Sequence, residues 1–394
     1  MASRDPIVIS PLQALADKNQ FDGVIDVRSP AEYALDHFPA AINLPVLSND
    51  ERIQVGTAHK RASAFEGSRL GAALVARNIA DIIDSQLADK PRTWRPLIYC
   101  WRGGQRSQSL AIILARIGWR TFLLDDGYQG YRRAIVEQLS APQNTVPFVV
   151  IAGRTGTAKS LVLGQLAAAG EQVLDLEGLA RHKGSVLGGL PNNPQPSQKA
   201  FESAVATVLR TIDPCRPVYV ESESKKVGGC HVPDQVMVQM RASPVITIEA
   251  SVPWRANYLL QDYQHFTQSK DVLFQQLDCL IPLHGSQKIA AWKHLAEQSA
   301  WPAFVTSLLN EHYDPAYDKA IARNFKAWPS RAPDVGTAVT ENTINSASET
   351  AAKLRQQRCC TMTEQNPHLA ASQAADQIIA MRMIEVVNAA FNKA

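Results

Sequence analysis

The stretch PFVVIAGRTGTAKSLVLGQLAAAG, residues 147–170, decides the fold of its region, because its hydrophobic pattern changes from strand to helix within a few residues. PFVVIA is a short continuous apolar run, and KSLVLGQLAAAG has helical spacing and ends on glycine. A strand that leads through a glycine-bearing loop into a helix is the repeating unit of a parallel sheet covered by helices. The stretch therefore predicts an α/β fold.

The same alternation continues outward in both directions. Downstream, EQVLDL, PVYVES and PVITIEAS have the composition of strands, and the segment from about 285 to 325 is helical in pattern. Upstream, FDGVIDV, RPLIYC and RTFLLD are predicted strands that alternate with helical segments at 68–87 and 107–119. We predict two α/β domains in series. The boundaries are 1–140 for the first domain, 141–147 for a linker, 148–327 for the second domain with its helical extension, and 328–394 for a polar linker and a C-terminal helical tail.

Composition limits the classes of protein that the chain can belong to. Its 394 residues are 45% hydrophobic and 20% charged, with a formal net charge of +3, which permits a polyanionic partner without requiring one. No apolar run approaches the ~18 residues of a membrane span. The N-terminus MASRDPIVIS lacks the features of a signal peptide, so we expect a soluble, cytoplasmic protein with no membrane partner. The six cysteines form no CxxC pair, which argues against a zinc site and a disulfide framework.

The loop of the opening stretch has the pattern of a P-loop, in which backbone N–H groups surround a phosphate, a lysine reaches its outer oxygens and a hydroxyl can bind Mg²⁺. The predicted phosphate-binding residues are Gly153, Thr155, Gly156, Thr157, Ala158, Lys159 and Ser160. Alanine stands at position 158 in place of the last glycine of the pattern; if φ is positive there, alanine costs about 1 kcal/mol. The predicted magnesium ligands are Ser160 and Glu221, with Glu223 as the alternative carboxylate. Because a P-loop recognises phosphates, its ligand need not be a nucleotide.

A second motif, YCWRGGQRSQSL at 99–110, places Cys100 between a strand and a helix. Turns of this kind direct backbone N–H groups into one anion-binding concavity, which favours the thiolate form of a cysteine. Gly103 and Gly104 would allow tight curvature, and Arg102 and Arg106 would add positive charge. The spacing Cys-x5-Arg also fits a protein phosphatase, but such an enzyme needs a general acid, and Tyr99 stands where a histidine would precede the cysteine. We therefore favour transfer of a sulfur-like atom carried on Cys100.

The segment DVRSPAEYALDHFPAAINLPV at 26–46 resembles the corresponding part of rhodanese domains, in which a strand ending in DVR precedes the cysteine loop. The resemblance covers residues 5–140 and implies a rhodanese-like first domain. Asp26 and Arg28 are expected at the edge of the site, with structural and electrostatic roles equally open.

Further blocks resemble the tRNA 2-selenouridine synthase family over about residues 5–325. They are NDERIQVGTAHK, CWRGGQRS, DLEGLARHKGSVLGG, VYVESESKKVG, IEASVPWRANYLLQDY and EHYDPAY, in this order. The DLEGLA block is the most specific of them, because neither a lone rhodanese nor a generic P-loop kinase carries it. The tail beyond about 330 has no counterpart in this resemblance.

The resemblance implies a two-stage modification of 2-thiouridine at the wobble position of certain tRNAs. Its C2 sulfur would be alkylated with geranyl diphosphate, and selenium from selenophosphate would then replace the alkylated sulfur. Lys159, the loop amides and Mg²⁺ would stabilise the diphosphate leaving group, while Cys100 would hold selenium as a perselenide beside Arg102 and Arg106. No tightly bound cofactor is implied. The implied partners are the tRNA, the two small-molecule donors and, transiently, an enzyme that supplies selenophosphate.

Binding of tRNA requires cationic and aromatic side chains near the two motifs. The candidates for tRNA or diphosphate contacts are Trp101, Gly103, Gly104, Arg181, His182, Lys183, Lys225, Lys226 and Arg255. Trp101 and Tyr128 would stack on an unpaired base, with core packing as an equal alternative. His182 is a candidate acid or base, against a purely structural role.

Two other functions fit parts of the sequence. A rhodanese-type sulfurtransferase whose P-loop domain only binds a regulatory nucleotide would use a small sulfur donor without tRNA. A degenerate P-loop that only binds RNA is the third function, and Ala158 is the residue that favours it. Loss of Lys159 would spare the sulfurtransferase and inactivate the synthase, which separates these two hypotheses.

Overall fold

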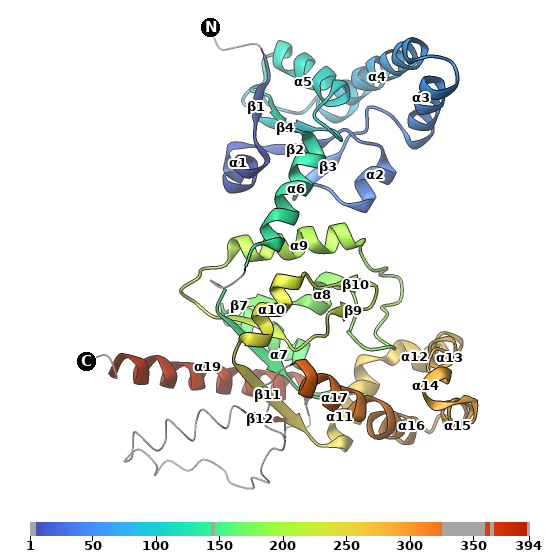
Figure 1. Ribbon diagram of the computed structural model, residues 1–394, viewed down its shortest axis with the longest axis vertical. Helices are drawn as coiled ribbons and strands as arrows, with labels where there is room; N and C mark the ends of the chain where they lie inside the picture. The colour runs from blue at the N-terminus through green and yellow to red at the C-terminus, as the bar shows by residue number, and fades with distance from the viewer. Residues whose placement is uncertain (1–4, 143–145, 325–358, 363–365, 392–394) are drawn as a thin grey trace. The chain divides into compact units, whose positions relative to one another are not determined.

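The computed structural model describes residues 5–142, 146–324, 359–362 and 366–391. The chain divides into two compact units, the first made of residues 1–141 and 196–207 and the second of 142–195 and 208–394. A five-stranded sheet lies in each unit, and all strand pairs in both sheets are parallel (Figure 1). The predicted α/β fold class is confirmed.

The sheet of the first unit has the strand order β1-β5-β4-β2-β3. Its strands in chain order are β1 (Ile7–Ile9), β2 (Gly23–Asp26), β3 (Ala41–Asn43), β4 (Pro96–Tyr99) and β5 (Phe122–Leu124). The surrounding helices are α1 (Pro11–Ala16), the short η1 (Lys18–Gln20), α2 (Pro30–Leu35), α3 (Asn49–Arg61), α4 (Ala64–Gln86), α5 (Gln105–Ile117) and α6 (Gly127–Ser140). Asp26 and Tyr99 are in register at the ends of β2 and β4, so the residues that follow both strands gather at one sheet edge.

The sheet of the second unit has the order β12-β11-β6-β8-β7. Its strands are β6 (Phe148–Ala152), β7 (Gln172–Leu174), β8 (Val218–Glu221), β11 (Val245–Ala250) and β12 (Cys359–Met362), and a small antiparallel pair is formed by β9 (Lys226–Val227) and β10 (Cys230–His231). The helices nearest the sheet are α7 (Lys159–Ala168), α8 (Leu176–Ala180), α10 (Asp234–Ala242) and α19 (Pro367–Phe391). Helix α9 (Gln198–Thr211) begins in the first unit and ends in the second.

A helical subdomain follows β11 in the second unit, as the sequence pattern predicted. It contains α11 (Val252–Asp262), α12 (Gln264–Gln268), α13 (Lys270–Asp278), α14 (Ile281–His284), α15 (Ser286–Glu297), α16 (Trp301–Leu308), the π-helix η2 (Leu309–Tyr313) and α17 (Asp314–Asn324). Its apolar core includes Leu273, Leu277, Trp292, Phe304 and Leu309. No helix in the described ranges combines the length and apolarity that crossing a bilayer requires.

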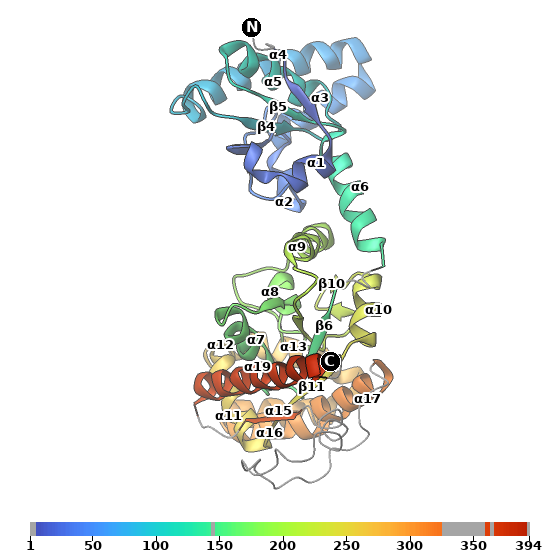
Figure 2. The ribbon, with the colours of Figure 1, turned by 90° about the vertical axis from the view of Figure 1, so that its left-hand side faces the viewer.

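The C-terminal tail contains the predicted final helix, α19, and also an edge strand that the sequence analysis did not predict. The predicted linker at 328–349 lies outside the described residues, but β12 adds a parallel edge strand to β11. Helix α19 packs on α7 and is visible beside the second sheet in Figure 2. Within 367–379, where burial is described, α19 buries Pro367, Ala370, Ala371, Ala374, Ala375 and Ile378, and the apolar core takes in the last five, four of them alanines. Small side chains allow close helix packing, so the tail is part of the core of the second unit.

Candidate functional site

The cysteine loop lies between β4 and α5, as the sequence predicted. Cys100 is 3% exposed, and its Sγ accepts a hydrogen bond of 3.1 Å from the Ser107 hydroxyl. Gly103 has φ +64°, and an added Cβ would lie 3.1 Å from the carbonyl oxygen of Leu124 at the end of β5, so glycine is required there. The amide of Tyr128 donates to the Cys100 carbonyl at 2.8 Å, which fixes the loop against the start of α6.

The two arginines of this loop are held by neighbouring side chains. Arg106 donates to the Glu32 carboxylate at 3.0 Å, and Arg102 donates to the Gln129 amide oxygen at 3.1 Å. Burial raises the pKa of Glu32, but hydrogen bonding and charge from Arg106 outweigh burial and hold the pKa below its usual value. Arg106 is therefore already paired with a carboxylate in this structure.

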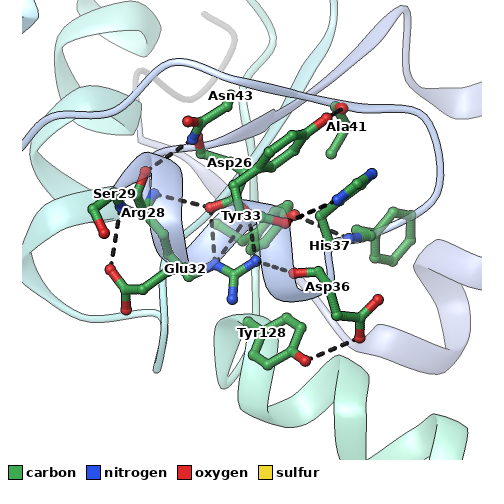
Figure 3. Close-up of polar contacts among 12 residues, drawn as sticks. Asp26, Arg28, Ser29, Glu32, Tyr33, Asp36, His37, Ala41, Asn43 and Tyr128 are labelled. Atoms are coloured by element: carbon green, nitrogen blue, oxygen red, sulfur yellow. Dashed lines mark hydrogen bonds and ion pairs between the residues drawn. The ribbon is translucent and has the colours of Figure 1, made fainter. Parts of the chain in front are cut away.

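Arg28 and Asp26 form a fully buried ion pair beside this loop (Figure 3). Arg28 also donates to the Asp36 carbonyl at 2.6 Å, and its guanidinium carbon lies 4.0 Å from the centre of the Tyr128 ring. The Tyr128 hydroxyl donates to the Asp36 carboxylate at 2.9 Å. These contacts support the structural role of Asp26 and Arg28, because the pair ties the end of β2 to α6 and supports the Tyr128 ring; the electrostatic role stays a prediction.

The P-loop lies between β6 and α7. Ala158 has φ +58°, so the positive φ considered from the sequence is present. Gly156 has φ +86°, and an added Cβ would lie 3.0–3.1 Å from Leu259 and Arg255. Lys159 donates to the Gly153 carbonyl at 2.8 Å, which leaves its ammonium group over the loop. Each of these positions follows from the strand–loop–helix pattern of the sequence.

Helices α11 and α17 hold the P-loop from outside it. Arg255 on α11 makes two hydrogen bonds to Asp314, of 2.7 and 2.8 Å, and one of 3.1 Å to the Thr155 carbonyl. The Tyr317 hydroxyl accepts the Gly153 amide at 2.7 Å. Because Arg255 is only 1% exposed, its burial is at odds with the expectation that it contacts RNA. Sequence reasoning placed the EHYDPAY block in the family but missed its contact with the loop.

Acidic side chains gather at the start of α7. The Ser160 hydroxyl donates to Glu177 at 2.7 Å, whereas Glu221 accepts the Leu176 amide at 3.1 Å. Burial, and next the charge of Glu177, raise the pKa of Glu223 to about 8. Burial and the nearby Asp175 carboxylate raise the pKa of Glu221 well above its usual range. Glu177 was missed, although its place just after β7 could have suggested it.

These carboxylates bear on the predicted magnesium ion. Among the described residues, no group of three or more His, Cys, Asp and Glu side chains is arranged to hold a metal by itself. Mg²⁺ usually takes only one or two carboxylates and completes its shell with water and substrate phosphates. Glu177 is hydrogen-bonded to Ser160, and Glu223 interacts electrostatically with Lys159, so these are the carboxylates nearest to the predicted cation position. The contact with Ser160 favours Glu177 over the predicted Glu221 as its partner.

The other basic residues that were predicted to contact tRNA or diphosphate differ in their ion pairs and in their exposure. Lys183 forms a 2.6 Å ion pair with Asp262 and lies 4.4 Å from the centre of the Tyr263 ring. Lys225 pairs with Asp234, while Arg181 and Lys226 are exposed. His182 is partly buried, and burial lowers the pKa of its ring.

An apolar pocket adjoins the P-loop within the second unit. Its empty space, which includes open solvent at the pocket mouth, amounts to about 540 Å³. Its walls are Thr155, Ser185, Leu187, Leu259, Leu260, Tyr263, Phe266, Thr267, Leu273, Trp301, Phe304, Val305, Leu308, Leu309 and Tyr313. Thr155 belongs to the P-loop itself, so the phosphate-binding loop forms part of the pocket wall. The sequence analysis did not predict this pocket, because its residues come from helices that are distant along the chain.

Comparisons with known proteins match both units. A rhodanese-like domain model matches residues 9–134, and a tRNA 2-selenouridine synthase AAA domain model matches residues 146–279. The tRNA 2-selenouridine synthase of Alcanivorax borkumensis is 32% identical over 332 residues, covering 76% of this chain and 90% of the relative. That of Marinobacter nauticus is 29% identical over 336 residues, covering 76% and 88%. A crystal structure described as the N-terminal domain of a putative ATP/GTP binding protein from Clostridium difficile is 35% identical, covers 33% of this chain and 98% of its own, and gives a TM-score of 0.29.

Proposed function

The chain belongs to the tRNA 2-selenouridine synthase family, and from this premise we propose that it converts wobble 2-thiouridine to 2-selenouridine by S-geranylation followed by selenium transfer. Membership of the family makes it a tRNA-modifying enzyme with a tRNA substrate. Geranyl diphosphate and selenophosphate are the proposed co-substrates, and the cytoplasm is the proposed location.

The observation that carries the geranylation step is the apolar pocket beside the P-loop. Geranyl diphosphate has an anionic head and an apolar tail of two isoprene units. The loop amides and Lys159 suit the head, and the leucine, phenylalanine and tryptophan side chains of the pocket suit the tail. Thr155 belongs to the P-loop and also lines the pocket, so one ligand of this chemistry would place its head at the loop and its tail in the pocket.

In the first step, the C2 sulfur of 2-thiouridine attacks the allylic carbon that bears the diphosphate. The carbon–oxygen bond breaks, diphosphate leaves, and the base loses its N3 proton to give the neutral S-geranyl nucleoside. Negative charge grows on the leaving oxygens, where Lys159 and the loop amides stabilise it. Mg²⁺, held by Ser160, Glu177 and Glu223, would supply further neutralisation of that charge.

In the second step, a selenium nucleophile adds to C2, the carbon–sulfur bond breaks, and geranyl thiol leaves. Water cleaves the P–Se bond of selenophosphate, phosphate leaves, and the released selenide is the nucleophile that Cys100, Arg102 and Arg106 would bind and direct to C2. The exchange of thiolate for selenide at C2 involves no net oxidation or reduction. A perselenide on Cys100 would form only if Cys100 were first oxidised to a mixed disulfide with a small thiol, which selenide then displaces, and a second thiol would release the selenium again. Assays should therefore contain a thiol together with its disulfide.

The geranylation step can be tested without selenium. Purified protein is incubated with 2-thiouridine tRNA and geranyl diphosphate, and the nucleosides are analysed by mass spectrometry. We expect S-geranyl-2-thiouridine from the intact chain and from Cys100→Ala, and unchanged 2-thiouridine from Lys159→Ala. If the intact protein leaves the nucleoside unchanged but transfers sulfur from thiosulfate to a small thiol, the sulfurtransferase hypothesis replaces this one.

A further inference from the structure

A second pocket lies on the first unit, next to the cysteine loop. It is lined by Trp101, Tyr128, Gln129, Arg132, Arg133 and Lys199, all of which belong to that unit. Trp101 directly follows Cys100 in the chain, and the backbone N–H of Gln129 donates to the Trp101 carbonyl at 3.0 Å. The pocket is therefore built on the same loop that positions the reactive sulfur.

One wall of this pocket is aromatic and rigid. The Trp101 and Tyr128 ring centres are 5.3 Å apart, with 33° between their planes. Tyr128 is fixed from behind by the Arg28 guanidinium and by its hydrogen bond to Asp36. Trp101 is only partly buried, so part of its indole remains available to a flat ligand.

The remaining walls are cationic. Arg133 is 67% exposed in its side chain and makes only an exposed 3.0 Å ion pair with Asp126, while Lys199 is exposed and lies 6.0 Å from the Trp101 ring centre. Exposed ion pairs are weak, so Arg133 can exchange Asp126 for a phosphate at little cost. Arg132 pairs with Glu202 and is less available. Aromatic faces next to cations are the combination that binds single-stranded nucleic acid.

We propose that this pocket holds the unstacked wobble nucleotide of the tRNA, with the base against Trp101 and flanking phosphates on Arg133 and Lys199. The inference rests on the proposed function for the identity of the nucleotide. Beyond that function, it identifies the surface that would present the base to Cys100. It also assigns Trp101 a substrate-positioning role, which the sequence had left level with core packing.

The test measures binding alone, so it is independent of catalysis. The probes are two fluorescein-labelled anticodon stem-loop RNAs, one with 2-thiouridine at the wobble position and one abasic there. Stacking of one base on an aromatic ring is worth roughly 5- to 150-fold in affinity. We expect Trp101→Ala to weaken binding of the 2-thiouridine RNA about 10-fold and to leave the abasic RNA nearly unaffected, with Trp101→Phe retaining most of the affinity.

Equal weakening of the two RNAs by Trp101→Ala would overturn the proposal. Arg133→Ala and Lys199→Ala provide a second test, which holds even if the Trp101→Ala protein does not fold. Each should reduce the slope of log affinity against log salt by about 0.7–1, whereas Arg77→Ala, an exposed arginine on α4 outside the pocket, should not. An unchanged slope in both pocket variants would contradict the phosphate contacts. Because neither donor is present, this test does not depend on turnover. Selective base binding here, combined with no product when the donors are supplied, would leave this inference standing and count against the proposed chemistry alone.

Discussion

At the scale of single residues, Ala158 is a strained position in a loop that otherwise follows its pattern. Its φ of +58° lies in the left-handed region, which costs an L-residue about 1 kcal/mol and glycine almost nothing. We expect Ala158→Gly to raise the Tm of the second unit by about 2–4 °C. The transition of this unit can be identified in calorimetry as the one that added pyrophosphate shifts. As a control, Ala167→Gly in the helix that follows should lower the same Tm; a fall in both variants would argue against strain at Ala158.

Glu223 gives the second unit a defined pH dependence. Its pKa is raised from 4.5 to about 8 by burial and by Glu177. Between these values the unfolded chain releases a proton that the folded chain retains, so stability falls as pH rises from about 4.5 to 8 and levels off above that. Glu223→Gln should flatten this decline in urea unfolding with EDTA present. Glu297→Gln, at an exposed glutamate on α15, should leave the decline in place; an unaltered decline in Glu223→Gln would refute the assignment.

Several site residues could be predicted from their local pattern, and others could not. Cys100 follows β4 and precedes α5, and Lys159 is the first residue of α7. Their neighbours along the chain therefore define their surroundings. Glu177, Tyr317 and Asp314 act through contacts with residues far away in sequence. Only a folded chain brings such residues together. The same holds for Arg255, whose ion pair with Asp314 and whose burial are not visible in the sequence.

At the scale of elements, long or strongly apolar segments were predicted well, whereas the edge strands β1, β3 and β12 were missed. The predicted strands at 95–100 and 147–152 correspond to β4 and β6. β1 and β3 each have three residues, too few to show a period, and β1 is largely exposed on its sheet edge. β12 contains two cysteines within a polar context and is defined by its pairing with β11. Pairing, and not propensity, makes these segments strands.

The pocket formed by α11, α13, α16 and η2 leads to a prediction about chain length. Each buried methylene contributes about 0.8 kcal/mol, so dimethylallyl diphosphate, one isoprene unit shorter, should show a kcat/KM lower by roughly 100-fold or more. Leu260→Trp, which fills part of the pocket, should impair use of geranyl diphosphate more than use of the shorter donor. Both effects are measured by nucleoside mass spectrometry over time.

A matched control is available for this variant. Leu283 is 70% exposed on α14 and does not line the pocket, so Leu283→Trp adds the same bulk elsewhere. It should leave the preference between the two donors unchanged. If Leu260→Trp also leaves that preference unchanged, the isoprenoid chain binds somewhere other than this pocket.

At the scale of the whole molecule, the chain joins two α/β units that each carry one candidate reactive centre. The first presents Cys100 after β4, and the second presents the P-loop after β6 with an apolar pocket beside it. The sequence predicted both α/β units because each has its own strand–loop–helix motif. It did not predict that residues 196–207 group with the first unit or that the C-terminal tail completes the second, because both depend on packing between distant segments.

The division of labour between the two units is tested most directly by supplying both donors together. Wobble nucleosides are analysed by mass spectrometry after 2-thiouridine tRNA, geranyl diphosphate, selenophosphate and a thiol together with its disulfide are incubated with the intact chain, Cys100→Ser or Lys159→Ala. We predict 2-selenouridine from the intact chain, accumulated S-geranyl-2-thiouridine from Cys100→Ser, and unchanged 2-thiouridine from Lys159→Ala. Formation of 2-selenouridine by Cys100→Ser at the rate of the intact chain would contradict the account.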